Sequence, residues 1–404
     1  MSSPIFLTKV EFIMKLGGAL HRYGTPAQRL EQALTLVAEK LNIHSQFFST
    51  PTSIMASLRG ADSEVTRVLR VQPGEVDLGK LTELDLLGDD AITGRISLAE
   101  CSKQIDIISA RESIYGPGVV VASHGLSSFG VACLFQASVH DVAWASLIGC
   151  VVGVLSSIAK RSERVQRVFE ATAAFLASAI AAAASIHDPR VFTPTVVLAG
   201  IIALIPGLSL TIALTELSTQ HLIAGTARFM GALITLLKLV FGVVLGTTLV
   251  SLYTEIPEHV VSAALPGEFL WVGLLFASLA SVVIYRAPPR DAGWVMIASM
   301  TGFLASKVGT YAIGPTLGVF VGGFAIGAGS NVFARVLKRP AQTIVVPGIV
   351  LLVPGSMGYK SFSFFANDDV LRGVGSGFSM FLIAITIVAG VLFGNAFISP
   401  KRSL

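Results

Sequence analysis

Leu204-Ile205-Pro206-Gly207 closes one apolar stretch of the sequence, and Leu352-Val353-Pro354-Gly355 closes another, 148 residues later counted from proline to proline. A proline followed by a glycine is a strong helix breaker. Paired breaks inside two apolar segments are typical of transporters built from inverted repeats, in which discontinuous helices surround a central site. The alternative left open is that each Pro-Gly pair only ends a helix at the membrane surface.

The composition around these segments excludes an ordinary soluble protein. Of the 404 residues, 53% are hydrophobic and 13% are charged, whereas soluble domains carry roughly 25% charged residues. Residues 1–115 hold 26 of the 54 Lys, Arg, Asp and Glu side chains. The sequence therefore predicts a small polar domain over 1–115 and a membrane region after it. The net charge of +4 fits basic loops at a membrane better than nucleic-acid binding.

The first 115 residues show the pattern of a compact cytoplasmic α+β domain. An amphipathic helix is expected over 8–43, broken near Gly24-Thr25-Pro26, followed by strands over 46–49, 53–58 and 65–71. Gly60-Ala61-Asp62 is expected to turn between the last two strands, and helices are expected over 78–87 and 97–113.

No catalytic motif is recognisable in this domain. We expect no enzyme, no cofactor and no metal, because the three cysteines lack metal spacing. The acidic cluster Asp85, Asp89 and Asp90 is expected to be a solvated helix end rather than a cation site. The hydroxyl residues around Pro51 are expected to form a strand-edge turn rather than a nucleophile loop.

Ten apolar segments follow, each a candidate membrane span of about 20 residues. They cover 118–138, 142–159, 168–186, 191–206, 229–250, 269–285, 291–306, 311–333, 341–357 and 373–396. Divided at residue 250, they give two five-helix repeats over 116–250 and 251–404, and an odd number of spans inverts the second repeat. Pro206-Gly207 is then expected toward the cytoplasm and Pro354-Gly355 toward the outside.

Basic residues gather in alternate loops of this array. They are Lys160, Arg161, Arg164, Arg167, Arg286, Arg290, Arg335, Lys338, Arg339, Lys401 and Arg402. The segment 253–268 has three glutamates and no basic residue. Because cytoplasmic loops carry an excess of Lys and Arg, we expect a multi-pass protein of the cell membrane (plasma or inner) with both termini in the cytoplasm.

Lys238 is expected near the middle of the membrane, about 14 Å along its helix from Phe229. A lysine there costs at least about 2.5 kcal/mol to insert, so it should face the helix bundle or a wet cavity. It is a candidate anchor for a substrate carboxylate, and a structural ion pair or snorkelling is the alternative.

Other polar or helix-breaking residues complete the candidate site. For substrate binding they are Arg228, Pro206, Gly207, Pro354, Gly355, Ser356 and Asn331, and for proton coupling Glu216, His124 and Asp141. Free N–H groups after Pro206-Gly207 would attract a carboxylate. Each candidate has a structural alternative: an interface anchor for Arg228, a solvated loop acid for Glu216, and interhelical hydrogen bonds for His124, Asn331 and Asn395.

Several stretches resemble the threonine/serine exporter family of bacteria and fungi. They are Tyr23-Gly24 through Arg29-Leu30-Glu31, Pro51-Thr52-Ser53, Leu204–Arg228, Arg286-Ala287-Pro288, Arg335–Pro340, Val346-Pro347-Gly348 and Leu352–Ser356. The resemblance covers nearly the whole chain and implies a secondary exporter, or antiporter, of small polar amino acids driven by an ion gradient. Relatives often have a small polar residue and an Asp where this chain has Ile212 and Glu216.

Three functions remain open on this evidence. The first is a proton-coupled exporter of threonine, serine or a similar small solute, and a dicarboxylate such as succinate is the alternative substrate because some relatives are linked to dicarboxylate export. The second is a membrane-anchored hydrolase acting through residues 1–115, and the third is a passive channel. Membrane lipid is an expected partner, and a homo-oligomer is left open.

Overall fold

A computed structural model describes residues 4–61, 63–353 and 355–399. Its first part, which we call the head, comprises α1 (Pro4–Arg22), α2 (Ala27–Lys40), β1 (His44–Thr50), β2 (Ser53–Arg59), β3 (Glu64–Arg70), α3 (Leu78–Thr93) and α4 (Leu98–Ala110). The expected order of elements is confirmed. The predicted break of the first helix is present because Gly24 has φ +100°, a conformation open to glycine, and Pro26 starts the next helix.

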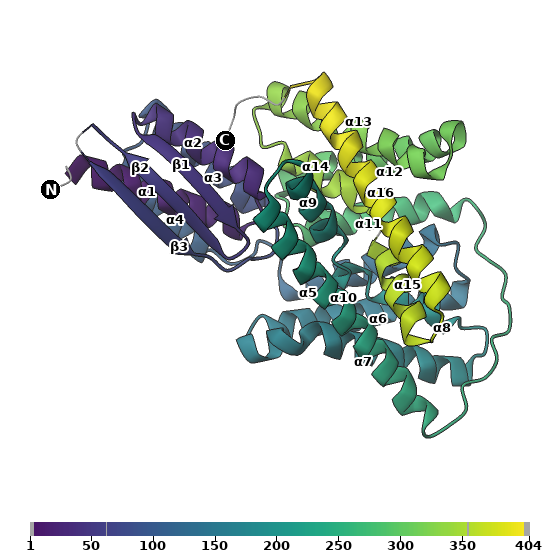
Figure 1. Cartoon of the computed structure of the whole chain (residues 1–404). Helices are drawn as coiled ribbons and strands as arrows, with labels where there is room; N and C mark the ends of the chain where they lie inside the picture. Colours follow the sequence, from purple (N-terminus) through teal and green to yellow (C-terminus); the bar gives the residue numbers. More distant parts are fainter. Residues whose placement is uncertain (1–3, 62, 354, 400–404) are drawn as a thin grey trace.

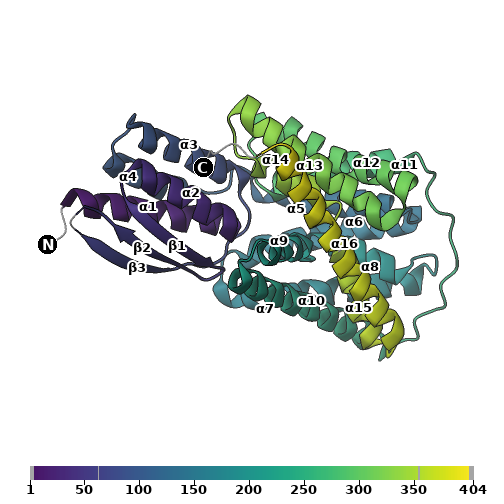
Figure 2. The same cartoon turned by 45° about the horizontal axis from the view of Figure 1, so that its top comes forward.

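The three strands form an antiparallel sheet in the order β1-β2-β3. On β2 the alternate residues Ile54, Ala56 and Leu58 are buried, and helices cover this face of the sheet (Figures 1 and 2). Pro51 and Thr52 form the turn between β1 and β2, as expected, and the Thr50 hydroxyl accepts a bond from Ser53 N–H. In the next turn Gly60 N–H donates to Ser63 O, and Asp62 lies outside the described residues.

The rest of the chain is helical. Its elements are α5 (Pro117–Leu134), α6 (Val139–Ala159), α7 (Glu163–His187), α8 (Thr193–Gly200), η1 (Ile202–Leu204), α9 (Gly207–Ser218), α10 (Leu222–Ser251), α11 (Phe269–Ile284), η2 (Pro289–Asp291), α12 (Ala292–Ile313), α13 (Pro315–Leu337), α14 (Gln342–Val350), α15 (Gly355–Ala366) and α16 (Val370–Phe397).

Six of the described helices are long and apolar enough to cross a membrane, and up to eight spans result if each bent helix pair counts as one. The expectation of ten spans is therefore confirmed only in part. Helix α11 has 16 residues, about 24 Å at 1.5 Å per residue, against roughly 30 Å of hydrocarbon. Helix α12 is longer, but Lys307 and several hydroxyl residues make it less apolar.

The two bent pairs occupy equivalent places in the order of helices. The pair α8/α9 bends by 52° and the pair α14/α15 by 41°. Each pair follows three helices and precedes one long helix, α10 or α16. Helices α9 and α16 are in contact, and so are α15 and α10. The second helix of each bent pair therefore packs against the long helix that follows the other pair.

Equivalent helices run in opposite directions relative to the head. The Tyr115 hydroxyl, just before α5, donates to Ala287 O, just after α11, at 2.6 Å. Helix α10 starts beside the head, where His221 pairs with Glu31 at 3.4 Å. Helix α16 starts far from the head and returns to it (Figure 1).

The head is fixed to the helical part by helix N-termini. The backbone N–H groups of Leu78 and Gly79, which start α3, donate to the carbonyls of Tyr285 and Arg286 at 3.0 and 3.2 Å. Arg286 also forms ion pairs with Glu75 and Asp77. The hydrophobic core of the head continues into Val282, Val295 and Val346. The head and the helical part therefore share one continuous hydrophobic core.

Candidate functional site

The two Pro-Gly breaks meet inside the helical part. A Cβ atom on Gly355, the first residue of α15, would lie 3.0 Å from the Cα atom of Gly207, the first residue of α9. A Cβ atom on Gly207 would lie 2.4 Å from Val353 Cγ1. Neither position has room for a side chain, so the starts of α9 and α15 are in direct contact.

This contact corrects one expectation about the breaks. We expected Gly207 toward the cytoplasm and Gly355 toward the outside, but the two glycines touch and therefore lie at one depth. The reason is that each break interrupts its segment midway, so the break does not lie at a helix end on the membrane surface. Pro354 lies outside the described residues.

A cavity of about 240 Å³, which we call the central cavity, lies at this contact. Gly207, Gly355 and Ser356 line it, together with residues of α5, η1, α11, α12 and α14. Its hydroxyl groups come from Ser127, Ser281, Tyr285 and Ser356, and those of Ser127, Tyr285 and Ser356 have no hydrogen-bond partner among the described residues. At roughly 30 Å³ per water, it holds the volume of about eight waters.

Helix ends give the central cavity its charge. Helix α9 begins without a side-chain cap, and the N–H groups of Leu208 and Ser209 find no acceptor among the described residues. The starts of α9 and α15 carry partial positive charge, and the end of α14, at Val350, carries partial negative charge. No Lys, Arg, Asp or Glu is among the described residues that line it.

Arg228 and Glu216, two separate candidates in the sequence, form one ion pair. Arg228 Nε and Nη2 donate to the two carboxylate oxygens of Glu216 at 2.9 and 3.0 Å. The backbone N–H of Ala27, at the start of α2, also donates to Glu216 at 3.0 Å. The Glu216 side chain is 0% exposed, so the alternative of a solvated loop acid is wrong. Glu216 joins α9 to the head.

Lys238 lines neither the central cavity nor the second cavity that is described below. Its Nζ lies 3.7 Å from the Glu170 carboxylate, and its side chain is 40% exposed. It also donates to Arg167 O at 3.4 Å. This is the structural ion pair that the sequence left open as the alternative to a substrate anchor.

His124 and Asp141 are also held by structural contacts. His124 Nδ1 is 2.9 Å from Val120 O within α5. Asp141 and Ser138 form the capping box of α6, and Asp141 Oδ1 accepts the Phe192 N–H at 2.7 Å. Neither residue lines a described cavity.

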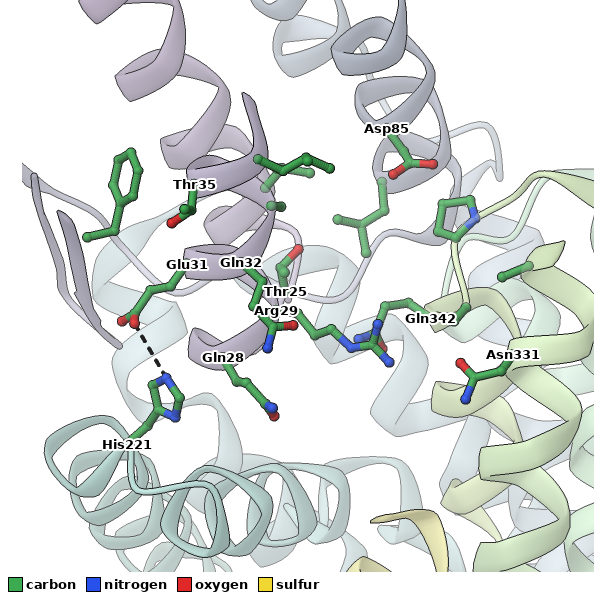
Figure 3. Close-up of a pocket in the computed structure, with 18 of the residues that line it drawn as sticks. Thr25, Gln28, Arg29, Glu31, Gln32, Thr35, Asp85, His221, Asn331 and Gln342 are labelled. Atoms are coloured by element: carbon green, nitrogen blue, oxygen red, sulfur yellow. Dashed lines mark ion pairs between the residues drawn. The ribbon is translucent and has the colours of Figure 1, made fainter. Parts of the chain in front are cut away.

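Asn331 forms the predicted interhelical bond. Its Nδ2 donates to Asn395 Oδ1 and to Ile398 O, both at 2.7 Å. It also lines a second cavity, of about 710 Å³, which lies between α2 of the head and the α13–α14 region. We call this the junction cavity (Figure 3).

Two features of the junction could not be expected from the sequence. Arg29 points into the junction cavity (Figure 3). His21 is buried, with Nε2 2.8 Å from Thr50 O, and burial lowers the pKa of its imidazole. No local pattern indicates either, because both depend on contacts between distant segments.

Comparison with known proteins identifies similar chains. A family model for threonine/serine exporters matches residues 11–250, and a second, described as "Threonine/Serine exporter, ThrE", matches residues 271–397. These matches confirm the resemblance found in the sequence. No solved structure matches the chain.

Several fungal proteins are among the curated relatives. The chain is 29% identical over 372 residues to pheromone-regulated membrane protein 10 of Debaryomyces hansenii, and 28% identical over 371 residues to the protein of that name from Eremothecium gossypii. It is 26% identical over 363 residues to an uncharacterized protein of Schizosaccharomyces pombe. The matches cover 88%, 88% and 87% of this chain but 36%, 49% and 48% of the relatives. The chain thus spans less than half of their length.

Proposed function

The chain belongs to the threonine/serine exporter family, and on that premise we propose that it is a secondary exporter of a small α-amino acid, threonine or serine, that binds in the central cavity. The observation that carries the proposal is the contact of Gly207 with Gly355. Two broken helices that meet at a cavity provide a binding site whose walls belong to both halves of the molecule, as alternating access requires.

The polarity of the central cavity favours an amino acid over a dicarboxylate. A zwitterion brings one negative and one positive group, which suit the helix starts and helix ends at this cavity. The side-chain hydroxyl of threonine or serine can form hydrogen bonds with the hydroxyls of Ser127, Tyr285 and Ser356, which have no partner among the described residues. A dicarboxylate would bring two negative charges to a wall on which the described residues offer no cationic side chain. Burying the second charge without a partner is costly.

Alternating access rests on two inverted five-helix repeats, over 116–250 and 251–404. The shared order of helices, the reciprocal contacts of α9 with α16 and of α15 with α10, and the opposite directions of α10 and α16 support this arrangement. The polar domain over 1–115 then lies on the cytoplasmic side. Inverted repeats have an outward-open and an inward-open state of similar structure.

Proton coupling, as part of this proposal, is assigned to Glu216 rather than to His124 or Asp141. Helix α9 places Glu216 about 14 Å from Gly207, at the opposite end of the same short helix. A change in the charge of Glu216 would loosen its bonds with Arg228 and Ala27, and so free α9 to move. Asp141 has both oxygens bonded in a helix cap.

The experiment compares glycine substitutions in proteoliposomes preloaded with labelled threonine, with and without a proton gradient. Gly355→Ala places a methyl group against Gly207, whereas Gly231→Ala, the control in α10, meets nothing within 4 Å. We expect Gly355→Ala to export at least about tenfold more slowly, equivalent to about 1.4 kcal/mol. Gly231→Ala should export at the native rate, and both variants should incorporate equally. Native export by Gly355→Ala would contradict the proposal.

A further inference from the structure

The junction cavity is large, its lining combines polar and apolar side chains, and it shares no lining residue with the central cavity. Its volume of about 710 Å³ falls within the roughly 300–1,000 Å³ of small-molecule sites. Gln28, Arg29, Gln32 and Thr35 project into it from one side of α2, Thr25 lies just before this helix, and Gln342 and Asn331 face them from α14 and α13 (Figure 3).

Arg29 is the cation of this cavity. Its guanidinium has no ion pair and no hydrogen bond with any residue that the structure describes. Figure 3 shows the side chain reaching from α2 toward Gln342 and Asn331. Burial lowers the pKa of this guanidinium, because desolvation disfavours the charged form. Arg29 is half-buried, and a guanidinium that no described residue pairs with is open to an anion that supplies charge-assisted hydrogen bonds.

Asn331 supplies the opposite hydrogen-bonding group. The residue is fully buried, and its Nδ2 is bonded to Asn395 and Ile398. Its Oδ1 has no partner among the described residues. Buried polar atoms are nearly always bonded, so this oxygen can accept a hydrogen bond from a donor that the described residues do not supply.

Acidic side chains also line the junction cavity. They are Glu31, Glu39 and Asp85, and Glu31 is bonded to the Ser49 N–H and pairs with His221. A simple anion would meet Arg29 but would be repelled by this wall. A molecule with a carboxylate and a cationic donor at opposite ends satisfies both signs of charge.

We propose that the junction cavity is a second binding site for a small α-amino acid, whose carboxylate pairs with Arg29 and whose ammonium or hydroxyl group donates to Asn331 Oδ1. The site rests on the proposed function only for the choice of threonine as the probe. Its occupant contacts α2, whose first N–H is bonded to Glu216 at the end of α9. The second site is therefore connected to the broken helix that lines the central cavity.

The test measures protection of a cysteine in the full-length purified protein. Gln32→Cys places a thiol in the lining, one turn from Arg29, and a maleimide labels it. Background labelling is low because Cys101 and Cys133 are buried and Cys150 is half-buried. We expect threonine at about twice its Kd to slow labelling about threefold, since the rate falls by 1 + [L]/Kd. Threoninamide, which lacks the carboxylate, should not slow it.

Two comparisons make the result specific to Arg29. Adding Arg29→Gln should abolish protection of Gln32→Cys, Arg29→Lys should retain part of it, and labelling of Arg67→Cys on β3 should not respond to threonine. Protection that persists in Arg29→Gln, or no protection in the native background, would overturn the second site. If export of threonine fails while protection is seen, the proposed function is wrong and the second site stands. If export proceeds but threonine gives no protection, the second site is wrong and the proposed function stands.

Discussion

At the scale of single residues, burial decides what an ion pair contributes. Glu216–Arg228 and Glu64–Arg59 have similar contact distances, 2.9 and 3.1 Å, but the Glu216 side chain is 0% exposed and that of Glu64 is 51% exposed. Exposed pairs contribute little to stability because water screens them. Removing one partner of a buried pair leaves the other charge without compensation.

The first prediction follows from this contrast. Glu216→Gln leaves Arg228 largely buried without a counter-charge, and we expect a loss of about 3 kcal/mol of folding free energy. The midpoint of thermal unfolding in detergent should fall clearly. Glu64→Gln is the matched control and should leave the midpoint unchanged. Equal unfolding midpoints for the two variants would show that the Glu216–Arg228 pair does not contribute to the stability of the folded protein.

The second prediction concerns Lys238, which the sequence proposes as a substrate anchor. Because Lys238 pairs with Glu170 and lies away from the central cavity, we expect Lys238→Met to keep export within about twofold of the native rate. Measured abundance in the membrane serves as the control. A tenfold loss of export at normal abundance would instead restore the anchor role, because it corresponds to about 1.4 kcal/mol of lost binding.

At the scale of elements, glycines set how closely helices approach. Helices α5 and α11 cross at Gly130 and Gly273, and a Cβ atom on Gly130 would lie 2.6 Å from Ala277 N and 2.7 Å from Gly273 O. A Cβ atom on Gly273 would likewise lie 2.7 Å from Gly130 O. Small residues at such crossings let two backbones pack directly against each other.

The third prediction tests this crossing with two alanines in one helix. Gly130→Ala forces the backbones of α5 and α11 apart, and we expect a loss of about 1–3 kcal/mol. Gly118→Ala, also in α5, meets nothing within 4 Å and should be neutral or slightly stabilising. Thermal unfolding of the two purified variants gives the comparison. A native midpoint for Gly130→Ala would mean that the crossing tolerates separation.

Prediction from the sequence succeeded where the signal is local. The break at Gly24, the order of helices and strands along the head and the bends near Gly207 and Gly355 all follow from glycine, proline and apolar periodicity. The partners of Glu216, Arg29 and Lys238 could not be predicted, because each partner or cavity belongs to another segment. The sequence identified Glu216 and Arg228 as separate candidates, and only the fold brings them together.

At the scale of the whole molecule, the distribution of basic residues distinguishes the end that carries the head from the opposite end. Lys160 and Arg286 pair with Glu75 of the head segment. Arg335, in the last turn of α13, and Arg339, between α13 and α14, lie at the same end. The opposite end carries the loop 252–268, which Val260 N–H ties to Pro189 O. The loop runs along the far side of the molecule in Figure 1.

The fourth prediction is the orientation of the molecule in the membrane. Because Lys and Arg are enriched in cytoplasmic loops, the end with the head should face the cytoplasm. Ser162, the residue before α7, lies two residues from Lys160, which pairs with Glu75, and Glu258 lies in the far loop. An impermeant maleimide added to intact cells should label Glu258→Cys and not Ser162→Cys, and permeabilised cells should show labelling of both. Labelling of Ser162→Cys from outside, with Glu258→Cys silent, would reverse the orientation. It would also place the junction cavity on the outer side, where it would meet extracellular rather than cytoplasmic amino acids.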